Sequence, residues 1–128
     1  MSPLGIAPDG LVDRIFVSLD LETTGLDPES DDIIEVGAVK FRGEDVVDSF
    51  STLVNVGRPL PVFVQSLTGI LEHDLETAPA FANIGERLEN FLGTHPVVGH
   101  SIGFDLAFLR RKGIHPPGPP YDTLDLAS

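Results

Sequence analysis

Two carboxylates stand close together at the end of an alternating segment. Asp20 and Glu22 are separated by one residue within 14–22, where aliphatic residues occupy every second position. Such alternation is typical of a β-strand, in which positions i and i+2 point to the same face. Neighbouring carboxylates repel one another, and a hard cation such as Mg²⁺ or Mn²⁺ removes that cost. The pair therefore indicates a metal site, although two solvated acids at a strand end are the simpler alternative.

A third carboxylate, Asp105, follows the short apolar segment 96–99. The pattern predicts that 96–99 is a buried strand and that Asp105 lies in the first turn of a helix over 101–112. An acid in that turn interacts favourably with the helix dipole, which could be its whole role. Its neighbours are aromatic and aliphatic, however, and an acid in apolar surroundings usually needs a partner. We therefore expect Asp105 to join the first two carboxylates.

The elements that must position these acids follow from the hydrophobic pattern. The connection 42–44 has hairpin length, so the first three strands are expected to form an antiparallel meander, with 96–99 beside the first strand. Thr77 is expected to cap a helix that has Pro79 in its first turn and ends at Gly93. The sequence predicts strands 14–22, 32–41, 45–55 and 96–99, and helices 59–67, 77–92 and 101–112.

The segment after the first strand is rich in glycine and acids. Gly25 is expected to let another backbone approach closely. Residues 26–31 are expected to form a turn-rich loop, in which the acids Asp27, Glu29 and Asp31, with Asp32, are interpreted as solvated charge.

Composition sets limits on the class of protein. The chain has 128 residues, 41% of them hydrophobic, which suits one globular domain. It has no cysteine, so a thiolate metal site is excluded. The formal net charge of −12 argues against a basic nucleic-acid face, but not against an enzyme that holds phosphate through metal ions. We found no signal peptide or membrane-spanning segment and therefore expect a cytoplasmic location.

Taken together, the motifs resemble the DEDD family of 3′→5′ exonucleases. The resemblance is to the branch with the proofreading epsilon subunit of bacterial replicative polymerase, and also to exonuclease domains fused to some bacterial helicases. It runs from residue 14 to 128 in one unbroken order. The matching segments are Asp20-Leu-Glu-Thr-Thr-Gly-Leu26, Ile33-Ile-Glu-Val-Gly-Ala-Val39, Leu67-Thr-Gly-Ile70, Ala78-Pro-Ala-Phe81, Val98-Gly-His-Ser-Ile-Gly-Phe-Asp105 and Tyr121-Asp-Thr-Leu-Asp-Leu-Ala127.

The resemblance implies a fold, a reaction and a site. The fold would be ribonuclease H-like α/β, a mixed sheet with antiparallel first strands and flanking helices. Two Mg²⁺ or Mn²⁺ ions about 4 Å apart would clamp the scissile phosphate, held by Asp20 as bridging ligand with Glu22 and Asp105. The substrate would be a single-stranded 3′ end, DNA rather than RNA, and the product a 5′-mononucleotide. A polymerase or a helicase would be the protein partner. The terminal nucleotide would be lined by Thr23, Thr24, Gly25, Leu26, His100 and Phe104.

The chain departs from the family pattern at two places. Ser101 stands where the family often has Asn. The third motif, a His with an Asp five positions later on a helix, has no counterpart in the 23 residues after Asp105. His100 and Asp105 imitate that spacing, but they belong to the second motif.

These departures shape what we expect of the chain as a whole. We expect a lead-in over 1–13 and an exonuclease domain over 14–128 that lacks its C-terminal part. Weak activity and self-association through an uncovered sheet face would follow. Two alternatives stay open. One is a non-catalytic module that binds nucleic acid or a partner, and the other is a phosphatase with Asp20 as nucleophile.

Overall fold

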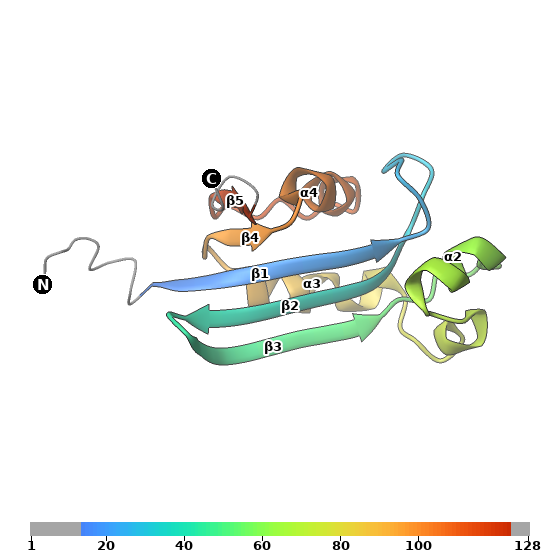
Figure 1. Ribbon diagram of the computed structural model, residues 1–128, viewed down its shortest axis with the longest axis horizontal. Helices are drawn as coiled ribbons and strands as arrows, with labels where there is room; N and C mark the ends of the chain where they lie inside the picture. The colour runs from blue at the N-terminus through green and yellow to red at the C-terminus, as the bar shows by residue number, and fades with distance from the viewer. Residues whose placement is uncertain (1–13, 124–128) are drawn as a thin grey trace, which may run out of the picture.

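The computed structural model describes residues 14–123 and contains one five-stranded sheet of order β3-β2-β1-β4-β5 (Figure 1). The predicted lead-in 1–13 and the final residues 124–128 lie outside the described residues. Each predicted strand is present, and the segment after residue 119 adds a fifth. The strands are β1 (Ile15–Thr23), β2 (Ile33–Arg42), β3 (Asp45–Leu53), β4 (Val97–Gly99) and β5 (Pro120–Asp122).

Strand β1 lies at the centre of this sheet. It pairs antiparallel with β2 along its whole length and parallel with β4 at Val17 and Ser18, so the expected meander and the place of β4 are confirmed. The side chains of Val17, Leu19 and Leu21 are at most 6% exposed, as the alternation predicts. The intervening residues, among them both carboxylates of β1, therefore point to the opposite face.

Two helices cover the buried face of the sheet. Helix α3 (Phe81–Leu92) runs behind β1 and β2 in Figure 1, and α4 (Ile102–Arg111) lies beside β4. Their apolar side chains share one core with β1 and β2. This core fixes the position of α4, which carries Asp105, relative to β1, which carries Asp20 and Glu22. The core side chains from the two helices are Ile84, Leu88, Leu92, Ile102, Leu106, Phe108 and Leu109.

A smaller apolar cluster fixes helix α2 (Val62–Thr68) at the end of the sheet where β1 finishes. Val64 of α2 packs there with Ile34 of β2 and with Leu75 of the 3₁₀ helix η2 (Glu72–Leu75), an element that the sequence pattern did not predict. Gly69 follows α2 with φ 78°, the left-handed conformation that ends helices.

The predicted start of the third helix is wrong. Helix α3 begins at Phe81 with Ala80 at its N-cap, so neither Thr77 nor Pro79 lies in or caps it. The carbonyl of Pro79 accepts a hydrogen bond of 2.9 Å from the backbone of Asn55, just beyond β3. This tertiary contact keeps the segment extended and delays the helix. The predicted end at Gly93 is confirmed.

The opposite face of the sheet carries an aromatic row that no described helix covers (Figure 1). Phe16 of β1 stacks on Phe41 of β2 with ring centroids 5.8 Å apart, and the ring of Tyr121 lies 6.3 Å from Phe16. We call these three residues the aromatic row.

Between residues 14 and 123, no helix is long and apolar enough to cross a membrane.

Candidate active site

The two carboxylates of β1 lie on the same face as the aromatic row, toward the other end of the strand. Asp20 is exposed, and Glu22 is half-buried. Glu22 stands directly opposite Glu35 of β2 in the ladder. Burial raises the pKa of Glu22, and the charges of Asp20 and Glu35 raise it further. Strand β1 therefore concentrates negative charge at its C-terminal end, while its other side chains on this face are uncharged.

Asp105 completes this cluster from helix α4. It lies in the first helical turn and is 5% exposed, the one acidic side chain among the described residues that is buried. Burial raises the pKa of Asp105 to about 7, with a further contribution from the charge of Asp20, while a hydrogen bond from the backbone of Leu21 opposes the shift. A helix dipole alone would not require a buried acid against β1.

The turn between β4 and α4 brings Asp105 to β1. A Cβ at Gly99 would lie 2.9 Å from the carbonyl oxygen of Leu19, so only glycine permits this approach. Ser101 then takes φ 54°, the one non-glycine residue with positive φ between 14 and 123. The carboxylate of Asp122 accepts a hydrogen bond of 3.2 Å from the backbone N–H of Ile102 and so caps α4 from β5. The resemblance implied no role for Asp122. Asp122 and Ile102 are 20 residues apart, so no local sequence pattern indicates this hydrogen bond.

The chemistry of these donors fits a hard divalent cation. Three neighbouring carboxylates disfavour joint ionisation. Burial raises the pKa of Glu22 and of Asp105, and the charge of Asp20 raises both further. Yet no three His, Cys, Asp or Glu side chains in the described part of the chain are already arranged to hold a metal ion. The structure thus brings Asp20, Glu22 and Asp105 within electrostatic reach of one another without forming a finished ligand set.

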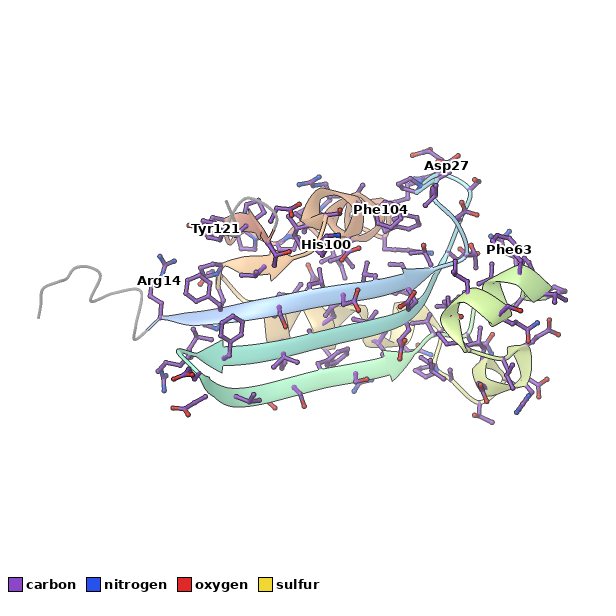
Figure 2. All side chains as sticks on the ribbon, viewed as in Figure 1. Arg14, Asp27, Phe63, His100, Phe104 and Tyr121 are labelled. Carbon is purple, nitrogen blue, oxygen red and sulfur yellow. The ribbon has the colours of Figure 1, made fainter. Side chains whose placement is uncertain are left out.

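A pocket of about 430 Å³ adjoins Glu22 at the end of β1. Figure 2 shows Phe63 of α2 and Phe104 of α4 reaching toward this end of the sheet from opposite sides. A pocket of this size and apolar character is typical of a small-molecule or nucleotide site. Its lining residues are Leu21, Glu22, Thr23, Thr24, Gly25, Leu26, Phe63, Val64, Leu67, Thr68 and Phe104.

The predicted lining residues are gathered here with one exception. Thr23, Thr24, Gly25, Leu26 and Phe104 all line the pocket, whereas His100 is exposed and does not. The ring of Phe104 lies 4.9 Å from that of Phe108, tilted by 51°.

Sequence reasoning missed the wall that α2 contributes. Phe63 and Leu67 are 66% and 80% exposed, although both are large and apolar. Helix α2 buries only Val64 in the core, so it has more apolar residues than its packing needs. That excess, on a helix of seven residues, was a signal that could have identified a ligand-facing surface.

The loop between β1 and β2, residues 24–32, is not the solvated loop that we expected. Asp31 and Asp32 are both half-buried, and Asp32 pairs with Arg58 at 2.5 Å. Gly25 is needed for a close approach, but the approaching group is the carboxylate of Asp31 and not another backbone. Asp27 and Glu29 are the more exposed acids of this loop.

Comparisons with known proteins agree with this geometry. Residues 17–114 match the sequence model of the exonuclease family RNase_T. The chain is 34% identical to a PolC-type DNA polymerase III of Bacillus cereus over 122 residues, or 91% of this chain and 8% of that protein. It is 36% identical to a DNA polymerase III subunit epsilon of Aquifex aeolicus over 103 residues, or 80% of this chain and 51% of that one.

The fold is also found in a solved structure. Exonuclease I of E. coli in complex with a dA13 oligonucleotide superposes with a TM-score of 0.76 at 16% identity, over 90% of this chain and 29% of that one. The predicted ribonuclease H-like fold is confirmed by this likeness. The chain spans about half the length of the epsilon relative and less than a tenth of the PolC-type relative.

Proposed function

Since this chain belongs to the RNase_T exonuclease family, we propose that it removes mononucleotides from 3′ ends of single-stranded DNA in a reaction that needs divalent metal ions. Family membership supports hydrolysis of phosphodiester bonds. The direction, the strand preference, the product and the metal requirement are the proposal. One observation carries it: a pocket lined by apolar side chains and by Glu22 opens beside the carboxylate cluster.

Asp20, Glu22 and Asp105 are proposed to hold the metal ions, Mg²⁺ or Mn²⁺. When bound, such ions stabilise negative charge on the scissile phosphate and lower the pKa of an attacking water. The buried position of Asp105 supports this role, because a cation would favour the ionised carboxylate that burial now disfavours.

The pocket is proposed to bind the terminal nucleotide. Leu26 and Leu67 are 83% and 80% exposed, and both line the pocket with Phe63 and Phe104. Aromatic and aliphatic side chains hold unstacked bases without regard to sequence, by about 1–3 kcal/mol per base. A paired base would have to leave its duplex first, which favours single-stranded ends.

DNA is proposed as the substrate because the relatives are subunits of DNA polymerase III and a structural neighbour was solved with a dA13 oligonucleotide. A replicative polymerase or a helicase is the proposed protein partner, and the cytoplasm is the corresponding location.

The general base and a fourth acid are proposed to lie in sequence that follows residue 128 in the whole protein. His100 is exposed and outside the pocket, so it is poorly placed to activate a water. The aromatic row lies on the same sheet face as Asp20, with no described helix over it. A further helix on this face would cover the row and could reach the carboxylates.

The test is cleavage of a 5′-labelled single-stranded DNA with Mg²⁺ or Mn²⁺. We expect products shortened stepwise from the 3′ end and release of 5′-mononucleotides. Asp20→Ala should lower the cleavage rate at least about 100-fold, because the variant lacks a proposed metal ligand. Asp48→Ala is the matched control, because Asp48 is an exposed acid of β3. Binding of the oligonucleotide without metal-dependent cleavage, even by a chain extended through the next helical segment, would instead identify a non-catalytic module.

A further inference from the structure

We propose that Asp31 is a positioning residue, which fixes the β1–β2 loop so that Leu26 stands at the edge of the nucleotide pocket. The inference rests on the proposed function, because it assigns Leu26 a place against the terminal base. Asp31 does not line that pocket. It lines a separate hollow on the other side of Thr24, together with Arg58.

The carboxylate of Asp31 joins two points of the loop. Its Oδ1 accepts a hydrogen bond of 3.3 Å from the hydroxyl of Thr24, and its Oδ2 accepts one of 3.0 Å from the backbone N–H of Asp27. The two anchored residues lie on either side of Gly25 and Leu26. The conformation of the two residues between them is therefore constrained from both ends.

Asp31 also fills the space beneath Gly25. A Cβ at Gly25 would overlap Oδ2 and Cγ of Asp31, so the carboxylate fits here only because residue 25 has no side chain. The backbone at Gly25 cannot move toward Asp31, and Leu26 projects the other way, 83% exposed at the pocket.

The base of the loop is fastened independently of Asp31. The backbone N–H of Thr24 donates to the carbonyl of Asp32 at 2.9 Å, and the N–H of Asp32 donates to the hydroxyl of Thr24 at 2.9 Å. Arg58 pairs with Asp32 and donates to the carbonyl of Ser30. Loss of the Asp31 carboxylate should therefore free the backbone N–H of Asp27 while the base of the loop stays closed.

The variant Asp31→Asn tests this directly. An amide has one acceptor oxygen in place of two, so it cannot keep the two separate oxygens that now accept from Thr24 and from Asp27. We expect amide hydrogen exchange at Asp27, followed by NMR, to become at least about tenfold faster. Glu29→Gln is the matched control, since it makes the same change of charge in the same loop at an exposed side chain. Unchanged exchange at Asp27 in Asp31→Asn would overturn the positioning role.

The second measurement is the Kd for a single-stranded oligonucleotide with a 3′-terminal phosphorothioate, in Mn²⁺. Asp31→Asn should weaken binding about tenfold, or about 1.4 kcal/mol, which is within the range that one stacked base contributes. The loss should vanish for an oligonucleotide whose last nucleotide lacks its base, and also in a Leu26→Ala background. A merely destabilised fold would weaken both oligonucleotides equally, and that result would overturn the proposal.

A second pair of variants guards against misfolding at Asp31. Thr24→Val removes the hydroxyl that donates to Asp31 and accepts from the N–H of Asp32, and Thr24→Ser keeps both hydrogen bonds. We expect the valine variant to reproduce the loss of base-dependent affinity and the serine variant to retain wild-type Kd; equal behaviour of the two would count against the proposal. Failure of the wild-type chain to bind either oligonucleotide would overturn the proposed function itself, whatever the exchange at Asp27 shows.

Discussion

Glu22 and Glu35 stand directly opposite each other in the β1–β2 ladder, on the sheet face that also carries Asp20. Like charges in facing positions destabilise a sheet, and here each is half-buried. The charge of Glu35 contributes to the raised pKa of Glu22. Glu35 therefore belongs to the electrostatics of the candidate site.

Removal of the Glu35 charge should weaken metal binding modestly. Glu35→Gln leaves the three proposed ligands in place but reduces the negative potential at Glu22. We expect about a two- to fivefold rise in the Mn²⁺ dissociation constant by calorimetry, since solvent still screens these half-buried charges and limits their interaction to about 1 kcal/mol. Asp20→Ala should abolish binding in the same assay. Equal effects of the two variants would show that Glu35 is itself a ligand.

Stability without metal should fall as the pH rises through the neutral range. The pKa of Asp105 is about 7 in the fold, against 3.8 for the free group. Between these values the unfolded chain has lost a proton that the folded chain retains, so raising the pH favours unfolding. The melting temperature should drop from pH 5 to pH 8 and should drop less in Asp105→Asn. A wild-type profile as flat as that of the variant would contradict the placement of Asp105.

Oligonucleotide binding should depend weakly on salt. Seven of the eight Lys and Arg side chains are engaged within the chain, with carboxylates, aromatic rings or other partners. Few are therefore free to displace counterions from phosphates, and log Kd against log salt concentration should have a slope smaller than about 2. A steep slope that Arg110→Ala reduces would instead reveal a phosphate-binding track at the end of α4.

Ser101→Asn should stabilise the chain. Ser101 has φ 54° and ψ 49°, a left-handed conformation that costs most residues about 1–2 kcal/mol and that Asn adopts more readily. We expect a gain of roughly 0.5–1 kcal/mol in the free energy of unfolding, measured in urea. Ser101→Val should do the reverse, because a branched side chain is strained there. A gain with valine would mean that the turn relaxes to another conformation.

The aromatic row should drive self-association of the isolated chain. Phe16, Phe41 and Tyr121 form a contiguous apolar surface on a face without a described helix. Sedimentation velocity should show association that increases with concentration and that Phe41→Ser reduces. Val62→Ser is the control, because Val62 is 78% exposed on α2, away from the row. A chain extended through the next helical segment should remain monomeric if that segment covers the row.

The sequence predicted the parts of the fold that depend on periodicity. Alternation along β1 showed which side chains face the core, and the short connection at Gly43 predicted the hairpin. The end of α3 followed from the conformational freedom of Gly93. Its start did not, because the contact between Asn55 and Pro79 is tertiary and has no local signature.

The candidate site was predictable where motif and strand geometry agreed. Asp20 and Glu22 share a face by the alternation of a strand, and the turn after Gly99 brings Asp105 against Leu21. The wall from α2 and the role of Asp31 were missed. The wall depends on which surface of α2 stays exposed after packing, and the role of Asp31 depends on hydrogen bonds across a loop. Neither follows from the spacing of residues in the sequence.

The order of the strands along the chain also determines when the parts of the candidate site can come together during synthesis. The meander of β1, β2 and β3 is built from neighbouring segments, whereas β4 must return to β1 from 80 positions further along, as the pairing of Val17 with Val97 shows. Contacts between distant segments form late, because their loops cost more entropy to close. A nascent chain that has left the ribosome only as far as β3 can thus fold its hairpins, but its three acids are not yet together. The three proposed metal ligands can therefore come together only after synthesis has passed α4.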